Sequence, residues 1–114
     1  MADGITFTRT EEQQLLASTL QDMLSTSTDG DTVRDLSLTE DALDSGTWSV
    51  LGEMGLIGMG LPSDVGGADA SVTDVSVLFE ELGRVVAAVP LLSTVLAARA
   101  IELAGSEFQR KALL

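Results

Sequence analysis

The chain has 114 residues, enough for one domain with a single core, and 45% of them are hydrophobic although only 4% are aromatic. Eighteen acidic residues against six basic ones give a formal net charge of −12, which disfavours nucleic acids and anionic membrane surfaces as partners. The sequence has no cysteine and no histidine, which excludes disulfides, thiol catalysis, Ser-His-Asp triads and most transition-metal sites.

The first half of the chain predicts one clear helix. Residues 1–9 form an N-terminal extension without the basic and apolar stretches of a signal peptide, so we expect a cytoplasmic protein. Residues 10–13 have the form of a capping box, and leucines at helical spacing follow, which predicts a helix over about residues 11–25. Residues 25–31 are typical of a turn, and residues 32–45 predict a loop with at most one helical turn.

The middle of the chain predicts a short helix and a glycine-rich connection. Residues 46–54 carry Trp48 and Leu51 on one helical face, and Gly55 is a natural C-terminal stop. The apolar segment 56–62 contains two glycines and ends in proline, which predicts an extended connector through or beside the core. Residues 63–70 predict a surface turn in which Gly66 and Gly67 permit a positive φ.

The last third predicts three helices. Residues 71–74 form a second capping box, which opens a helix with an apolar stripe made of Val75, Leu78, Phe79, Leu82, Val85 and Val86. Pro90 starts the next helix, which Gly105 ends and whose predicted inner face consists of Leu92, Val95, Leu96 and Leu103.

A third capping box at residues 106–109 opens a final helix that stops at Leu114 after about two turns. We expect the chain to be a fragment, or a subunit whose partner covers this end. The overall prediction is an all-α fold of about five helices, because strand signals are lacking and small or unbranched apolar residues dominate.

Motifs that suggest chemistry are weak. Asp29, Asp31, Asp35 and Glu40 occupy positions of a calcium-loop frame, but Arg34 stands where that loop requires glycine, so we read an acidic surface loop. The glycines of segment 55–60 match neither a dinucleotide-binding nor a P-loop spacing.

Charged residues near position 80 do not form a catalytic pair. Glu80 and Glu81 are neighbours on a helix and point about 100° apart, while both are spaced to pair with Arg84. We expect a solvated or interdomain charge cluster, and we identify neither a catalytic base nor a metal site. The face of Val89, Leu92, Ser93 and Leu96 is apolar with one hydroxyl. It fits either the wall of an apolar tunnel or an ordinary helix–helix core.

The order of these features over residues 10–114 resembles the N-terminal helical domain of flavin-dependent acyl-CoA dehydrogenases. The matching segments are Thr-Glu-Glu-Gln from residue 10, Trp48 with Leu-Gly-Glu-Met-Gly-Leu-Ile-Gly from residue 51, Leu61-Pro62, Gly66-Gly67, Glu-Glu-Leu-Gly-Arg from residue 80, Pro90, and Ala-Gly-Ser-Glu-Phe-Gln-Arg-Lys from residue 104. The family's usual Tyr-Gly-Gly turn is Val65-Gly66-Gly67 here.

The resemblance implies an orthogonal helical domain, truncated in its last helix, within an enzyme that converts an acyl-CoA to its 2-enoyl-CoA with FAD and passes electrons to an electron-transferring flavoprotein. It further implies that Ala88, Val89, Leu92 and Leu96 line the acyl pocket as apolar contacts. The segments that hold FAD and the catalytic base are outside this chain, so we expect no bound cofactor and no activity from these residues alone.

Two other interpretations remain open. The chain fits a free-standing helical module that binds an intact dehydrogenase subunit, or a catalytically silent subunit of a heteromeric dehydrogenase. In every case we expect the remaining domains or other subunits as partners, in a homo- or hetero-oligomer.

Overall fold

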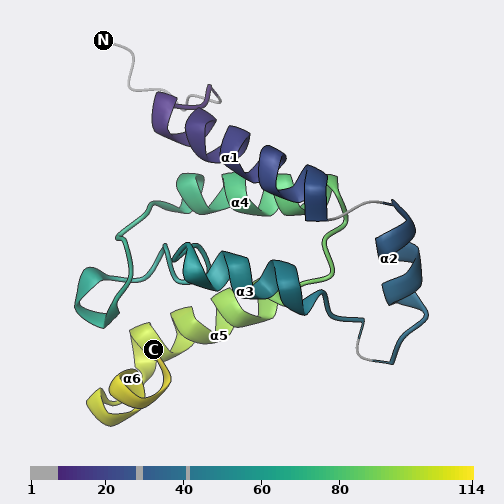
Figure 1. Cartoon of the computed structure of the whole chain (residues 1–114). Coiled ribbons are helices and arrows are strands. Elements are labelled where there is room, and N and C mark those ends of the chain that lie inside the picture. The colour runs from purple at the N-terminus through teal and green to yellow at the C-terminus, as the bar shows by residue number, and fades with distance from the viewer. Residues whose placement is uncertain (1–7, 28–29, 41) are drawn as a thin grey trace.

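The structure is a computed structural model that describes residues 8–27, 30–40 and 42–114. Its α-helices are α1 (Glu11–Ser27), α2 (Gly30–Ser37), α3 (Ser45–Glu53), α4 (Val72–Arg84), α5 (Leu91–Ala104) and α6 (Glu107–Leu113), with a 3₁₀ turn η1 (Ser63–Val65) between α3 and α4. The described residues contain no strand, so the predicted all-α class is confirmed, with six helices in place of about five (Figure 1). No helix among them is long and apolar enough to cross a membrane.

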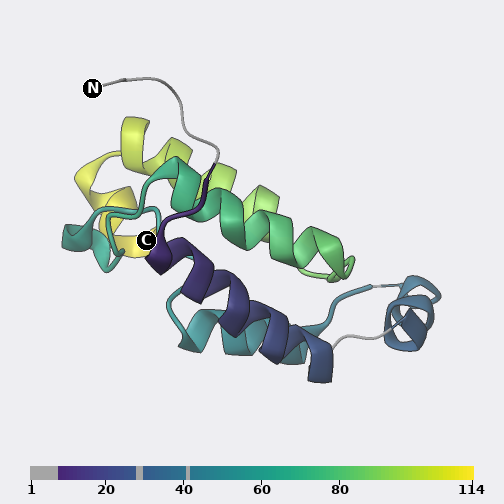
Figure 2. The ribbon, with the colours of Figure 1, turned by 90° about the horizontal axis from the view of Figure 1, so that it is seen from above.

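Four helices form two layers. Helices α1 and α4 lie side by side in one layer, and α3 and α5 lie beneath them in the other (Figures 1 and 2). Helix α2 stands apart at one end, and α6 folds back beside the end of α5. The extents of the molecule are 43 × 42 × 20 Å, so the fold is thin in one direction.

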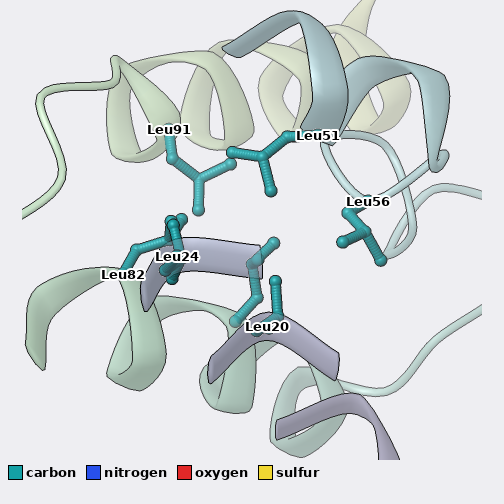
Figure 3. Close-up of a cluster of buried hydrophobic side chains, with 7 residues drawn as sticks. Leu20, Leu24, Leu51, Leu56, Leu82 and Leu91 are labelled. Atoms are coloured by element: carbon teal, nitrogen blue, oxygen red, sulfur yellow. The ribbon is translucent and has the colours of Figure 1, made fainter. Parts of the chain in front are cut away.

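A cluster of leucines joins the two layers (Figure 3). Its principal contact is between α1 and α4. Burying one leucine side chain contributes about 1.5–3 kcal/mol to folding, so these side chains provide most of the force that holds the layers together. The buried members are Leu20, Leu24, Leu51, Leu56, Leu78, Leu82 and Leu91.

All three predicted capping boxes are present. At α1, the Gln13 amide donates to Thr10 Oγ1 at 3.1 Å, and the Thr10 amide donates to Gln13 Oε1 at 3.0 Å. The same reciprocal pairs join Ser71 with Asp74 and Ser106 with Gln109. Because each box satisfies two amides that a helix start leaves unpaired, these helices begin where the sequence predicts.

The prediction of a loop over residues 32–45 is wrong for residues 32–37, which belong to α2, whereas the described residues between α2 and α3 are not helical. Helix α2 has eight residues, and α1 continues to Ser27, into the segment expected to be a turn. This helix is rich in residues with weak helix propensity (Gly, Asp, Thr and Ser), and for this reason the sequence did not predict it. Hydroxyls close its end, since Ser37 Oγ donates to the Arg34 carbonyl and Thr39 Oγ1 donates to the Leu36 carbonyl. Residue Asp29 of the rejected calcium frame lies outside the described residues.

The connector 56–62 is turned rather than extended. Leu56 is buried in the leucine cluster, and residues 57–60 form tight turns behind it. Gly66 has the expected positive φ of 88°, but Gly67 does not share it. Gly67 is required for a different reason, because a Cβ atom there would meet the backbone carbonyl of Leu61.

The predicted inner faces of α4 and α5 are partly wrong. In α4, Leu78 and Leu82 are buried as expected, while Val86 after its end is 67% exposed. In α5, the buried residue is Leu91, and the predicted inner residues Leu92, Leu96 and Leu103 are exposed. Helix α5 lies at the margin of a thin fold, so its first turn enters the core while most of its apolar surface does not.

The charge cluster on α4, for which the sequence predicts a solvated or interdomain position, is solvated only in part. Glu81 is 1% exposed, and its carboxylate lies 3.2 Å from an Arg9 nitrogen and 3.3 Å from an Arg84 nitrogen. Arg9 also donates to the exposed Glu80 at 2.7 Å, which lowers the pKa of that carboxyl group. A buried carboxylate is tolerated when paired cations and hydrogen bonds compensate for its lost hydration, and here Arg9 comes from the segment before α1.

Val86 has a φ of 52°, a conformation that costs a side-chain-bearing residue roughly 1–2 kcal/mol. We expect Val86→Gly to stabilise the protein by about 0.5–1 kcal/mol, because relief of this strain exceeds the added entropy of an unfolded glycine. Urea denaturation measures the change. The matched variant Val50→Gly lies inside α3 and is expected to destabilise by about the same amount. Equal destabilisation by both substitutions would contradict the strain at Val86.

Asp74 gives the stability a predictable pH dependence. A hydrogen bond from Gln13 Nε2 at 2.8 Å, and then those from Ser71, lower the pKa of its carboxyl group below the ordinary 3.8. A lowered folded pKa stabilises the fold above the unfolded pKa, and this stabilisation is lost as the pH falls through the folded value. We expect Asp74→Asn to cost about 1 kcal/mol at pH 7 and progressively less as the pH falls below about 4.

Denaturation midpoints between pH 7 and pH 2 check this expectation. Gln13→Ala keeps the charge of Asp74 and removes the first cause of its lowered pKa, so it should weaken the pH dependence without abolishing it. Curves for the wild type and Asp74→Asn that run parallel over the whole range would count against the assignment.

Candidate functional site

An apolar groove with a volume of about 640 Å³ lies between α4 and α5. One side is the face of α4 that carries Val72, Val75 and Phe79, and the other is the face of α5 that carries Leu92 and Leu96. The connector after α3 closes the base. The complete lining is Ile57, Gly60, Leu61, Ala70, Ser71, Val72, Val75, Ser76, Phe79, Leu92, Val95, Leu96, Ala98 and Arg99.

Helical spacing explains how the groove is formed. Val72, Val75 and Phe79 are separated by three and four residues, so they share one face of α4. Leu92, Leu96 and Arg99 do the same on α5. The base is closely packed because Gly60 carries no side chain, and a Cβ atom there would lie 3.1 Å from Val75 Cγ2.

The polar groups of the groove are already engaged. Ser71 Oγ accepts the Asp74 amide at 3.1 Å as the cap of α4, and Ser76 Oγ donates to the Thr73 carbonyl at 2.6 Å. Arg99 donates to Glu102 at 2.7 Å. The lining thus contains neither a carboxylate nor an activated hydroxyl, so it can bind an apolar group but offers no acid, base or nucleophile.

The structure brings together two of the four predicted pocket residues. Leu92 and Leu96 line the groove and are 60% and 61% exposed. Ala88 and Val89 are half-buried in the turn between α4 and α5, and Val89 packs against the leucine cluster instead. Their contact with a bound acyl group remains a prediction.

Sequence reasoning missed the α4 side of the groove. It assigned Val75 and Phe79 to the core stripe, and it did not assign Val72 to the site. The exposed Val72 is three residues before Val75 and seven before Phe79, and this spacing was the available signal. The described residues also hold no cluster of acidic side chains suited to a metal ion.

A family model for the N-terminal domain of acyl-CoA dehydrogenases matches residues 10–114. The chain belongs to the acyl-CoA dehydrogenase family. It is 33% identical over 88 residues to the acyl-CoA dehydrogenase IpdE2 of Mycolicibacterium smegmatis, a match that covers 76% of this chain and 28% of that protein. It is 31% identical over 92 residues to IpdE2 of Mycobacterium tuberculosis, covering 80% of this chain and 29% of that protein.

A solved structure supports the same relationship. A variant of the Tcur3481-Tcur3483 steroid ACAD matches with a TM-score of 0.81 and 35% sequence identity, over 90% of this chain and 28% of that one. The chain therefore spans little more than a quarter of the length of the relatives that it matches. Within the acyl-CoA dehydrogenase family, the matched residues 10–114 correspond to the N-terminal domain.

FAD was the cofactor expected from the family, and the groove does not fit it. A flavin dinucleotide carries a pyrophosphate, which proteins bind with cations or free backbone amides. Arg99 is the cationic residue of the groove, and it is paired with Glu102. The groove instead has the chemistry of a site for a hydrocarbon group.

Proposed function

We propose that this chain is the N-terminal helical domain of a flavin-dependent acyl-CoA dehydrogenase, which converts an acyl-CoA to its 2-enoyl-CoA. The observation that carries the proposal is the family match over residues 10–114. FAD and the catalytic base belong to parts of the enzyme beyond this chain, as do the contacts with an electron-transferring flavoprotein. We further propose a cytoplasmic enzyme that acts as an oligomer.

Within that enzyme the chain has a local role: it supports the neighbouring domains and forms one wall of the acyl pocket. Leu92 and Leu96 provide this wall, and Ala88 and Val89 continue it through the turn before α5. Their exposure supports the proposal, because two large apolar side chains left in water favour contact with an apolar partner. The hydroxyls of this wall are already hydrogen-bonded and its arginine is paired, so the wall has no reactive group. An inert wall suits this role, because it contacts the acyl chain while the reaction takes place at the α and β carbons, away from the wall.

The acyl group can be linear or carry rings. The solved structure that resembles this chain is a steroid ACAD, so an acyl-CoA with a steroid-like ring system is the first substrate to test beside straight-chain ones. A groove of about 640 Å³ accommodates either class once the other domains enclose it.

The first test is the visible absorbance of the complete protein, purified together with any subunits that copurify. A flavin spectrum and reduction of that flavin by an acyl-CoA are expected. A colourless protein that dehydrogenates no acyl-CoA would refute the proposal. Flavin found on a separate copurifying chain would instead support the alternative of a helical subunit bound to an intact dehydrogenase, with the groove as their interface.

The second test addresses the pocket wall. We expect Leu96→Trp to lower kcat/KM for the bulkiest accepted acyl-CoA by about tenfold, because the larger side chain overfills the groove. The shortest accepted acyl-CoA should be affected much less. Leu103→Trp makes the same change on an exposed residue of α5 outside the groove lining, and should leave the preference unchanged. Identical substrate profiles for both variants would contradict the wall role of Leu96.

A further inference from the structure

The turn between α4 and α5 determines where α5 lies relative to α4, and hence how wide the groove is. Hydrogen bonds from the Val86 and Ala87 amides to Gly83 and Leu82 fix the end of α4, and the buried Leu91 fixes the start of α5. Between them, Val86 is held in the left-handed region of φ. Such a conformation persists only where surrounding contacts enforce it.

A hydrogen bond from the start of α3 reaches the same turn at Ala88. The backbone amide of Asp44, the residue that caps α3, donates to the Ala88 carbonyl at 2.8 Å. This hydrogen bond joins segments 44 residues apart and connects the lower layer of the fold directly to the turn. This hydrogen bond also satisfies the Ala88 carbonyl. Pro90, two residues later, has no backbone N–H and cannot donate to it.

The Asp44 amide is itself held in place by the cap. Asp44 Oδ1 accepts the Thr47 amide at 3.1 Å, and Asp44 Oδ2 accepts the Thr47 hydroxyl at 2.7 Å. Thr47 is 2% exposed, so both groups sit in a fixed environment. With both carboxylate oxygens engaged, Asp44 has little freedom to rotate, and its amide points steadily at Ala88.

We propose that Asp44 and Thr47 are positioning residues for the acyl site: through the Ala88 carbonyl they set the width of the α4–α5 groove and thereby the size of the acyl group it accepts. This inference rests on the proposed function. Neither residue touches the groove, and they act through the turn that carries Ala88 and Val89. The sequence offers no sign of this role, because Asp44 and Ala88 are far apart along the chain.

The enzymatic test uses the complete protein. Asp44→Ala is expected to change the ratio of kcat/KM between a bulky and a short acyl-CoA by about fivefold to tenfold, the factor that corresponds to the free energy of a helix cap. The kcat for the short substrate and the flavin content should stay as in the wild type. Asp44→Asn keeps an acceptor for the Thr47 amide and is expected to restore the ratio to within about twofold.

A matched control separates positioning from simple loss of a cap. Ser106→Ala removes the corresponding side-chain cap of α6 and should cost similar stability, but Ser106 has no link to the turn. We expect Ser106→Ala to leave the ratio of kcat/KM between the bulky and the short acyl-CoA unchanged. If Asp44→Ala and Ser106→Ala give the same ratio as the wild type, the positioning role is refuted while the dehydrogenase function stands.

A structural readout keeps the inference testable without catalysis. The chain has no cysteine, so spin labels at Thr73→Cys and Leu103→Cys, both outside the groove lining, mark α4 and α5 alone within it. Electron paramagnetic resonance should give one narrow distance distribution, which Asp44→Ala broadens or shifts and Ser106→Ala does not. An unaltered distribution with Asp44→Ala would overturn the proposal. An altered distribution in a protein that lacks flavin and activity would instead reject the proposed function and retain the control of groove width.

Discussion

Packing of α1 against α4 is the contact on which the rest of this domain depends. Leu20 and Leu24 of α1 meet the leucines of α4, and α3, the connector and α5 each contribute one buried leucine to the same cluster (Figure 3). Because α1, α3, α4 and α5 share this single cluster, Leu92, Leu96 and Leu103 on the outer face of α5 remain exposed in the described part of the chain. Helix α5 buries only Leu91 in this cluster, so its other leucines stay at the surface, and two of them line the apolar groove.

Charge strengthens the same contact. Arg9, which precedes α1, reaches across to α4 and pairs with both Glu80 and Glu81. The ion pair with the exposed Glu80 contributes little to the free energy of folding. Leaving the buried Glu81 unpaired would instead destabilise the fold, because its charge would lose hydration without compensation. The network therefore acts less as a source of stability than as a constraint on where the segment before α1 must lie. That placement in turn fixes the start of α1 above α4.

The groove has an apolar lining without free reactive groups. Its hydroxyls are used in helix caps and turns, and its arginine is paired. In the proposed function, neighbouring parts of the dehydrogenase therefore supply the chemistry and this domain supplies the shape of the pocket wall. Shape in a thin fold depends on few contacts. In the proposed positioning role, the turn between α4 and α5 controls the size of the accepted acyl group, since a small shift of this turn moves a whole face of α5.

The sequence by itself determined the helical class, the family and the starts of α1, α4 and α6. Capping boxes join residues three apart, so a local pattern is sufficient to define them. It also named Leu92 and Leu96, half of the predicted pocket wall. Only the tertiary structure decided that these leucines face the groove rather than the core, and that Val72 lies opposite them. The burial of Glu81 and the strain at Val86 were likewise not readable from the sequence. Each of these features depends on partners distant along the chain, as Arg9 is from Glu81 and Asp44 from Ala88, and spacing within one helix carries no information about such partners.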